Sequence, residues 1–333
     1  MDLHYSIGEA LGTDYFGLRE PFTAQQEGYL VRTREFVDAE VLPVINGYWG
    51  RAEFPWALIE KMSPLGIIGD GIEGYGCPPM DPLSAGLINM EINRGDGSLG
   101  TFMAVQAGLA MKAIAKCGSE EQKQRWLGPM ARLEKIGAFA LTEPEHGSDS
   151  VSLGTTARQA EIELDGVRVP AENRLPGANS FKDCAAVLTG TRSACAWMAL
   201  GHAVAGFDAA LTYAKRRTQF GKSLASFQII QQRLVRMLAD VTAMQLYCVQ
   251  IAKLDAAGKL APTLAGLAKL HNTSKARVVL ADARDMLGGN GILLDFHVIR
   301  HMVDIESIHT FEGTETIQTL IVGWDITGVS AFS

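Results

Sequence analysis

The sequence has few cysteines and fewer positive than negative charges. Its 333 residues include 5 Cys, none in a CxxC pair, so we expect free thiols in a reducing compartment. Lys and Arg total 30 and Asp and Glu total 37, which gives a net charge of -7. The basic residues form no long continuous block. Because clustered basic side chains bind phosphate backbones, nucleic-acid binding is not expected.

Long apolar runs and a secretory signal are also missing. Charged residues or glycines interrupt the apolar stretches before they reach the ~18 residues of a membrane span. The stretch Met1–Glu20 has acidic side chains and no apolar segment of the signal-peptide type. We therefore expect a cytoplasmic protein without a membrane span.

Metal-ligand spacing is limited to one pair of histidines. His297 and His301 stand four residues apart and could share a helix face, but no HExxH motif or third ligand accompanies them. We interpret them as hydrogen-bonded or solvated side chains and expect no metal site.

The sequence does have length and apolar content. With 47% hydrophobic residues it can bury enough surface to offset the entropy of ordering, so a disordered chain is excluded. The length corresponds to about two domains. Differences in the local pattern of apolar and polar residues divide the chain into residues 1–133, 134–177 and 178–333.

The first region has helical periodicity. Its apolar residues recur at Tyr29, Leu30, Phe36, Val37, Val41, Val44 and Ile45. We expect Pro43 near the end of that helix. Ser119 followed by Glu120 and Glu121 predicts a helix start, because serine caps free N–H groups and acids favour the first turn.

The last region predicts longer helices. One apolar stripe consists of Ile230, Leu234, Leu238, Val241, Met244, Cys248 and Ile251, and another of Leu264, Leu267, Leu270, Val278, Val279 and Leu287. Three or four such helices in succession predict an antiparallel bundle.

The middle region predicts short strands. Ile136–Thr142 is an apolar run, and Ala160–Leu164 alternates with period two before an Asp165-Gly166 turn. The predicted fold class is therefore mostly α with a small β insert.

Two nucleotide-binding patterns lack the context that they need. Residues 69–74 match GxGxxG, but a helical segment precedes them and Pro78 and Pro79 follow, where a dinucleotide fingerprint needs a strand and then a helix. Gly221-Lys222-Ser223 resembles the end of a P-loop, but Arg216 replaces its first glycine. Neither pattern predicts nucleotide hydrolysis.

Four other motifs are informative through their order along the chain. They are Leu141–Asp149, Arg217–Gly221, Leu287–Gly291 and Phe311–Ile317. Taken singly, they are ordinary polar turns, helix caps or a solvated carboxylate. Together they resemble the acyl-CoA dehydrogenase family, flavoenzymes that oxidise acyl-CoA thioesters between the α and β carbons. The resemblance covers about residues 33–332.

The resemblance implies an N-terminal helical domain, a truncated middle β-domain and a C-terminal four-helix bundle, matching the three regions above. Within the family, Asp285–Gly291 and His297–His301 resemble glutaryl-CoA dehydrogenases, whereas Ser98–Phe102 and Leu175–Phe181 resemble short-chain acyl-CoA oxidases and their dehydrogenase relatives. Gly100 stands where glutaryl-specific members carry an Arg. Because an unpaired buried charge is costly, we expect a short or medium monocarboxylic acyl chain.

The resemblance also implies FAD as cofactor, an electron-transfer flavoprotein as acceptor and a homotetramer. Glu312 would be the catalytic base, since desolvation raises the pKa of a carboxylate toward the working pH. Phe311 stands in place of a usual Tyr, and Trp324 in place of a frequent Arg.

Further roles follow from the matching motifs. Substrate would contact Ser148, Arg192 and Gly313. FAD would contact Thr142, Ser148, Thr314 and Thr316, and a neighbouring subunit would add Arg217, Gln219, Phe220, Asp285, Gly288 and Gly289.

One departure from the family follows Arg158. Members continue there with several strands, including a Trp-Ile segment that packs on the flavin, whereas here Gln159 follows at once. At ~5–6 residues per strand and ~4–6 per connection, roughly 50–60 residues are missing. An omitted stretch, a deletion and a shortened, impaired homologue remain open. The alternatives in function are a dehydrogenase, an oxidase that uses oxygen, and a non-catalytic scaffold.

Overall fold

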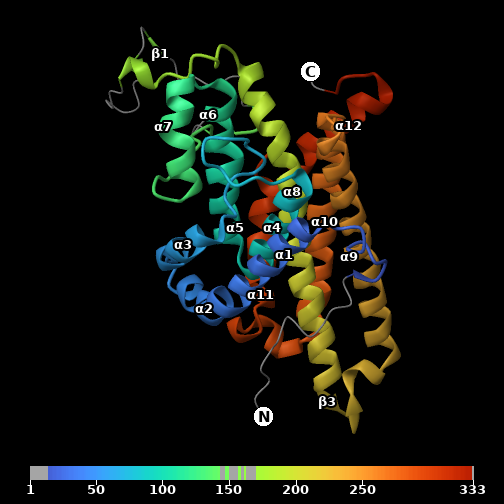
Figure 1. Cartoon of the computed structure of the whole chain (residues 1–333). Coiled ribbons are helices and arrows are strands. Elements are labelled where there is room, and N and C mark those ends of the chain that lie inside the picture. The colour runs from blue at the N-terminus through green and yellow to red at the C-terminus, as the bar shows by residue number, and fades with distance from the viewer. Residues whose placement is uncertain (1–13, 143–146, 150–156, 159–160, 163–169, 332–333) are drawn as a thin grey trace.

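Helix α8 (Phe181–Arg216) runs through the length of the molecule, and many of the other helices pack against it (Figure 1). The computed structural model describes residues 14–142, 147–149, 157–158, 161–162 and 170–331. Within these ranges the regular structure is almost entirely helical, and the two small sheets have two strands each. The prediction of a mostly α fold with a small β insert is confirmed.

The N-terminal half begins with a long helical rod. α1 (Ala24–Phe36), the π-helical η3 (Val37–Val41) and α2 (Leu42–Gly50) follow one another without a break. Thr23 and Gln26 form a capping box that satisfies N–H groups without a helical partner. The prediction for Pro43 was wrong: it lies in the first turn of α2, within this continuous helical run.

Shorter helices complete this half. They are α3 (Trp56–Met62), η4 (Ser63–Leu65), α4 (Pro82–Gly95), α5 (Gly97–Met103), the π-helical η5 (Ala104–Met111), α6 (Lys112–Cys117) and α7 (Glu120–Ala131). The predicted start of α7 is confirmed, because Ser119 and Gln122 form a capping box. The GxGxxG pattern lies in the loop between η4 and α4, without a strand before it.

The middle region has less strand than the sequence predicts. β1 (Ala157–Arg158) pairs antiparallel with β2 (Glu161–Ile162), and η6 (Ala171–Asn173) precedes α8. The strand prediction for Ile136–Thr142 was wrong. A strand needs a partner, and the backbone groups of Ala138–Leu141 bond to no residue in the described ranges. The predicted Asp165-Gly166 turn lies outside the described residues.

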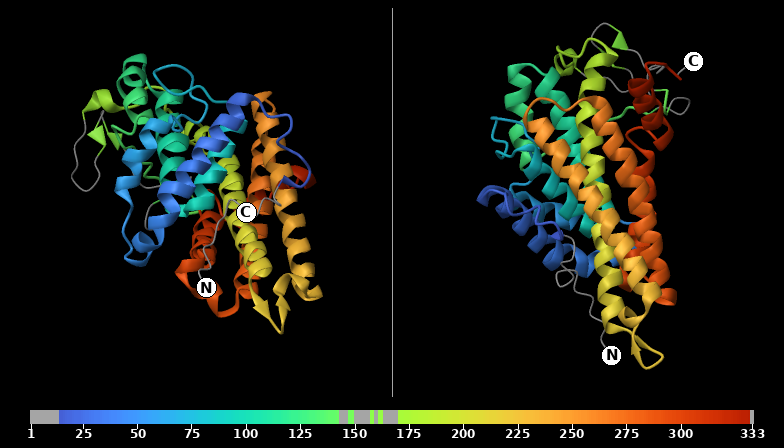
Figure 2. Two further views of the ribbon diagram at one scale, coloured as in Figure 1. Left: turned by 60° about the horizontal axis from the view of Figure 1, so that its bottom comes forward. Right: turned by 90° about the vertical axis from the view of Figure 1, so that its right-hand side faces the viewer.

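The C-terminal half is a bundle of long helices. A hairpin of β3 (Thr218–Gln219) and β4 (Lys222–Ser223), followed by η7 (Leu224–Ser226), joins α8 to α9 (Gln228–Ala256). α10 (Pro262–Met286), η8 (Gly288–Ile292), η9 (Leu294–Phe296), α11 (Val298–Thr310) and α12 (Glu315–Thr327) follow. Figure 2 shows α8, α9 and α10 running side by side. As predicted, Gly288 follows the end of α10, with φ 58°.

Small residues form the buried face of α10. Ala265, Ala268, Ala276 and Ala283 are completely buried. Of the predicted apolar stripe, Val279 and Leu287 are buried, whereas Leu264 and Val278 are 39% and 50% exposed, so the stripe is only partly confirmed. The cause is the close approach of α8: a Cβ added at its Gly206 would lie 2.7 Å from Leu280 of α10. Close-packed helices favour small side chains where their backbones approach.

Two helical stretches are long and apolar enough to cross a membrane by length and composition alone. They are Gly97–Cys117 and Phe181–Arg216, and charged residues and glycines interrupt both, as the sequence indicates. However, 89% of the apolar window in Phe181–Arg216 is buried inside the protein, and half of the window in Gly97–Cys117. The apolar character of α8 is therefore accounted for by its place in the core.

A buried cluster around Arg300 joins the two halves. Arg300 of α11 donates to Asp96 Oδ2 (3.1 Å), to the Gly95 carbonyl (2.8 Å) and to His297 Nδ1 (3.2 Å). Nearby, the Nδ1 atoms of His202 and His301 lie 2.7 Å apart. The prediction of hydrogen-bonded histidines is confirmed. A search of the described residues finds no group of side chains that could hold a metal ion.

Burial controls the titration of this cluster. It lowers the pKa of His202 and His297 to about 3 and that of His301 well below its usual value. It raises the pKa of Asp304, which lies 3.8 Å from Arg300, to about 6. Below about pH 6.5 the three imidazoles are therefore protonated in the unfolded chain but neutral in the folded chain, a difference of three protons. Between about pH 4 and pH 6 the carboxyl of Asp304 is protonated only in the folded chain, which reduces the difference to two.

The protein should therefore lose stability on mild acidification. With about two excess protons bound on unfolding, the free energy of unfolding should fall by roughly 2–3 kcal/mol per pH unit from about pH 6 to pH 4. His297→Asn, which keeps a residue tolerant of the left-handed backbone, should reduce this slope by about 1.4 kcal/mol per pH unit. Urea unfolding across this range measures both slopes, and equal slopes would contradict the assignment.

Candidate active site

Glu312 lies in the short connection between α11 and α12, and α12 stands near the top of Figure 1. Its backbone is left-handed, with φ 56°, and that of Gly313 has φ 84°. A left-handed residue other than glycine costs about 1–2 kcal/mol, so surrounding contacts must hold it. A side chain at position 313 is excluded as well, because its Cβ would lie 2.5 Å from Gln318 Nε2.

The carboxylate of Glu312 is half-buried against α8. Thr191 Oγ1 donates a 2.6 Å hydrogen bond to Glu312 Oε2. Burial raises the pKa of Glu312, and the Thr191 hydrogen bond, Lys269 and Arg192 oppose this rise. The result is a carboxylate whose proton affinity exceeds that of an ordinary glutamate, as general-base catalysis near neutral pH requires.

Two side chains fix the backbone around this carboxylate. Lys269 of α10 donates to the carbonyls of Phe311 and Gly313. Gln318 of α12 donates from Nε2 to the Glu312 carbonyl (2.9 Å). The Glu312 N–H has no acceptor in the described part of the chain, so it remains available as a donor.

Arg192 follows Thr191 on α8 and carries an unused donor. Its buried Nε has no hydrogen-bond partner in the described part of the protein. Burial lowers the pKa of Arg192, and the charge of Glu312 opposes that shift, which places both groups in one electrostatic neighbourhood. A buried guanidinium N–H without a partner suits a carbonyl or anionic group of a ligand.

An open, largely apolar groove of about 870 Å³ lies beside α8. Ala138–Leu141, Trp126 of α7, and Cys184 and Val187 of α8 are among the residues that line it. Burial and the charge of Glu312 both raise the pKa of Cys184, so the groove and the carboxylate are neighbours. With unpaired backbone groups along Ala138–Leu141, the groove fits an apolar ring system with polar edges, such as a flavin.

A much smaller cavity of about 20 Å³ lies on the other side of Thr191. It is lined by Asn89, Ala104, Gly108 and Ala194, and by Asp70, which is paired with Lys112. A Cβ added at Gly108 would lie 3.4 Å from both Thr191 Cγ2 and Asp70 Oδ2. The backbone at Gly108 therefore lies close to Thr191, and the charge of Asp70 beside it is paired with Lys112.

The residues predicted to bind FAD within the chain are only partly assembled. Thr142 and Ser148 are exposed and belong to the segment that lines the groove or follows it; residues 143–146 between them lie outside the described ranges. Thr314 caps α12 by accepting from the Ile317 N–H, and Thr316 is exposed on that helix. Trp324 is exposed, and nothing in the structure explains its substitution for Arg.

The residues predicted to reach a neighbouring subunit gather at the opposite end of the bundle. Arg217, Gln219 and Phe220 form the β3–β4 hairpin at the bottom of Figure 1, and Asp285, Gly288 and Gly289 end α10. Asn290 Nδ2 donates to the Tyr213 hydroxyl (3.0 Å), which joins the two ends. At 1.5 Å per helical residue, Arg217 stands roughly 39 Å from Thr191 along α8, so one chain presents two separate surfaces.

Sequence reasoning missed three residues that contact the Glu312 loop. Thr191 precedes the predicted Arg192 but belongs to no motif. Lys269 interrupts a helical face of small residues, and a charged residue on an otherwise buried face was the available signal. Gln318 lies one turn after the capping Thr314, and no pattern marks it.

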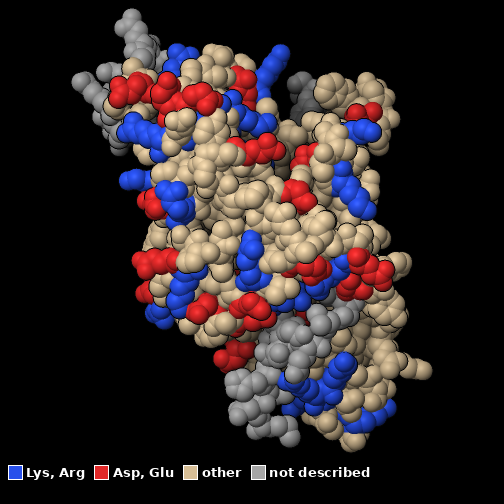
Figure 3. Space-filling view, viewed as in Figure 1, with Lys and Arg blue, Asp and Glu red and all other residues tan. Residues whose placement is uncertain are grey.

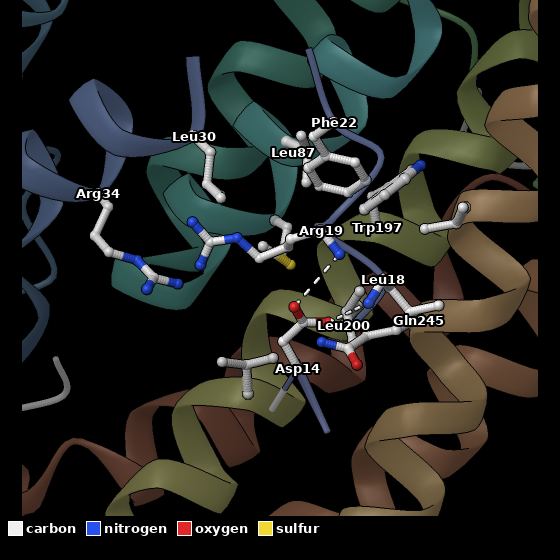
Figure 4. A pocket seen from close by; sticks show the side chains of 13 residues that line it. Asp14, Leu18, Arg19, Phe22, Leu30, Arg34, Leu87, Trp197, Leu200 and Gln245 are labelled. Carbon is white, nitrogen blue, oxygen red and sulfur yellow. Dashed lines mark hydrogen bonds between the residues drawn. The ribbon is translucent and has the colours of Figure 1, made fainter. Parts of the chain in front are cut away.

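A separate cavity of about 120 Å³ lies on a different part of α8, where Asp14–Phe22 covers α1, α4 and α9 (Figure 4). Trp197, Leu200 and Phe22 give it apolar walls. Its two arginines are already paired, Arg19 with Glu27 and Arg34 with Glu91. Because these charges are already satisfied, we assign it no part in the candidate active site.

Charged side chains of both signs are spread over the face of the molecule shown in Figure 3. Over most of that face Lys and Arg are interspersed with Asp and Glu, and several basic side chains gather at its lower end.

Comparisons with known proteins give a consistent result. The model of the acyl-CoA dehydrogenase N-terminal domain matches residues 23–134, and that of the C-terminal domain matches residues 181–326. The glutaryl-CoA dehydrogenase from Mycobacterium smegmatis superposes with a TM-score of 0.92 at 31% identity, over 97% of this chain and 99% of that one. The structure of a glutaryl-CoA dehydrogenase from Mycobacterium smegmatis in complex with FADH2 gives a TM-score of 0.93 at 27% identity, with the same coverage.

A relative of known name is longer than this chain within the aligned region. The mitochondrial short-chain specific acyl-CoA dehydrogenase of Bos taurus is 28% identical, and 87% of each chain is covered. That alignment has 358 positions, whereas 87% of this 333-residue chain is about 290, so about 68 positions have no residue here. Neither domain model takes in residues 135–180, where the sequence predicts the shortening.

Thr191→Val should raise the pKa of Glu312 further, because the hydrogen bond that favours the charged form is lost. A hydrogen bond to a charged group contributes about 1.5–3 kcal/mol, so the shift should be about one to two pH units. Infrared titration of the carboxylate band measures it, with Glu312→Gln as the blank. Thr189→Val, two residues away on α8, should leave the titration unchanged; equal effects would exclude a specific Thr191 bond.

Proposed function

Because the chain belongs to the acyl-CoA dehydrogenase family, we propose that it uses FAD to oxidise short- or medium-chain acyl-CoA thioesters, with Glu312 as the base that removes the α-proton. The observation that carries the proposal is the buried, ionisable carboxylate at the junction of α8, α11 and α12. Its raised pKa matches it to an acidic C–H bond. The large groove beside α8 offers space for the cofactor.

The residues of the chain supply the acid–base part of the reaction. Glu312 takes the α-proton, and the C–C bond gains double-bond character as the β-hydrogen departs. Negative charge collects on the thioester oxygen as the α-proton is removed and is lost again as the β-hydrogen leaves with its electron pair. The N–H of Glu312, which has no acceptor in the described part of the chain, can donate to that oxygen. Arg192 has an unused Nε–H within the same neighbourhood for the thioester or its CoA portion.

FAD, when bound, supplies the acceptor for the hydride from the β-carbon. The groove lined by Ala138–Leu141 suits the ring system, and Thr142 and Ser148 would contact it from the same segment. Similarity to a solved relative that holds FADH2 supports this assignment. Cys184 and Val187 of α8 would line the same site.

A short- or medium-chain monocarboxylic acyl group is the substrate that we propose. Asp70, which lines the cavity of about 20 Å³, is paired with Lys112, so the lining that the structure describes offers no unpaired cation to a distal carboxylate. At position 100 a Cβ would lie 2.2 Å from Asn93 Oδ1, so an arginine cannot be accommodated there without rearrangement. These features favour a monocarboxylic substrate although some solved relatives act on glutaryl-CoA.

An assembly of several chains, which we propose is a homotetramer, would bring the two surfaces of the molecule together. Phe220 is 92% exposed at the tip of the β3–β4 hairpin, roughly 39 Å from the Glu312 region. If it contacts FAD, as the resemblance implies, that FAD must be held by another chain. A site completed by a second copy also explains an aromatic side chain left in solvent.

We propose an electron-transfer flavoprotein as the acceptor, and oxygen is the alternative. The likeness of Ser98–Phe102 to short-chain acyl-CoA oxidases motivates that alternative. One assay distinguishes the two: acyl-CoA is added in the presence of oxygen, and flavin reduction and hydrogen peroxide are measured. A dehydrogenase reduces its flavin without forming peroxide, whereas an oxidase forms peroxide.

Phe220→Ala should reduce assembly and flavin retention together. If the hairpin completes a neighbour's site, the variant should elute with a smaller mass in light-scattering chromatography and retain less FAD. Val44→Ala, at an exposed apolar position of α2, serves as the control and should change neither. An unaltered mass and flavin content in Phe220→Ala would remove the hairpin from the site.

Glu312→Gln should abolish bleaching of bound flavin by butyryl-CoA. Loss of a general base lowers the rate by about 10²–10⁴-fold, while the flavin spectrum stays intact. Glu315→Gln is the matched control, since Glu315 is exposed on α12 and pairs with His309 (3.1 Å). Activity that survives Glu312→Gln would refute the assignment of Glu312 as the catalytic base. Protein that stays colourless and unbleached after FAD addition would instead favour the scaffold.

A further inference from the structure

Lys269 is a buried lysine whose role the proposed reaction leaves open. It is 1% exposed on the inner face of α10, among small residues such as Ala265 and Ala276. In the described part of the chain no carboxylate lies within ion-pair distance of it. Burial of this ammonium lowers its pKa, so the group needs compensating acceptors.

The compensation comes entirely from the backbone beside Glu312. Nζ donates to the carbonyls of Phe311 and Gly313, with a longer contact of 3.5 Å to the His309 carbonyl. An ammonium has three N–H groups, so these acceptors can use all of them. His309 belongs to the last turn of α11, where unpaired carbonyls and the helix dipole favour a cation.

Gln318 completes the grip from the α12 side. It donates to the Glu312 carbonyl (2.9 Å) and to the Gly313 carbonyl (3.2 Å). Three successive carbonyls, those of residues 311, 312 and 313, are thus bound by side chains of α10 and α12. This arrangement accounts for the left-handed backbone of Glu312, which has no glycine to make it easy.

We propose that Lys269 is a positioning residue for the reaction of Glu312: its ammonium clamps the backbone on both sides of the base and keeps the carboxylate against Thr191. The inference rests on the proposed function of Glu312 and adds a residue that does not touch substrate. A lysine suits the role because a compact ammonium can point its donors in three directions. The planar fork of an arginine cannot.

The charge of Lys269 has a second effect on the base. Burial raises the pKa of Glu312, and Lys269 lowers it. Removal of the ammonium should therefore raise the pKa of Glu312, and the acid limb of kcat/KM should move to higher pH. A lysine that only fills space in the core would not produce this shift.

Lys269→Met tests the clamp, because it keeps the length of the side chain and removes the ammonium. We expect a folded flavoprotein with kcat lowered about 10²-fold, the loss typical of a misplaced catalytic group, and KM for butyryl-CoA nearly unchanged. Lys275→Met is the matched control: Lys275 lies on the same helix but is partly exposed and pairs with Asp240 (3.0 Å). The control should retain kcat and the pH profile.

A readout that does not depend on turnover is the infrared titration of the Glu312 carboxylate, with Glu312→Gln as the blank. In Lys269→Met the carboxylate band should titrate at higher pH than in the wild type. If Lys269→Met does not fold, Lys269→Arg decides: the charge remains, so the titration should stay close to wild type, while kcat should still fall about tenfold or more.

Two results would overturn the proposal. One is Lys269→Met with wild-type kcat and an unshifted carboxylate titration. The other is Lys269→Arg with wild-type kcat, since the clamp requires three converging donors. A failure of the proposed function is distinguishable, because Glu312→Gln would then retain activity whatever happens at position 269.

Discussion

A carboxylate that is buried and still able to ionise is the constraint on which this structure depends. Taken out of water alone, such a group would hold its proton and could not act as a base. Glu312 is compensated by a hydrogen bond from Thr191 and by the charges of Lys269 and Arg192. These groups come from α8 and α10, so the compensation exists only while the helices keep their relative positions.

The packing of the bundle provides that rigidity. α8 and α10 approach so closely that Gly206 and a row of alanines occupy their contact. Such an interface has little freedom to shift, because close-packed interiors transmit small displacements. Arg300 fixes α11 to the end of α4 through Gly95 and Asp96. The element that carries Glu312 is therefore anchored at both ends, by Arg300 below and by the Lys269 contacts above.

Sequence patterns anticipated the local features better than the contacts between helices. The start of α7 and the glycine that ends α10 follow from interactions within a few residues, so Ser119 and Gly288 were readable in advance. The buried face of α10 could not be predicted in the same way. Its alanines are favoured by the short distance to α8 and not by their hydrophobicity, and the more hydrophobic Leu264 is partly exposed. Lys269 escaped notice for the same reason: its acceptors lie some forty residues away in sequence. Ile136–Thr142 reads as a strand, but pairing depends on partners that the sequence of the strand cannot specify.

The shortened middle region acts on a different part of the site from these contacts. Glu312, Thr191, Lys269 and Gln318 all lie in α8, α10, α12 or the connection before α12, within the range that the C-terminal domain model matches. None belongs to residues 135–180, which neither domain model takes in. A shortening there leaves the described hydrogen bonds around Glu312 intact. If the groove holds FAD as proposed, flavin retention and proton abstraction would therefore depend on separate segments of the chain, and a shortened middle region would affect the first without altering the second.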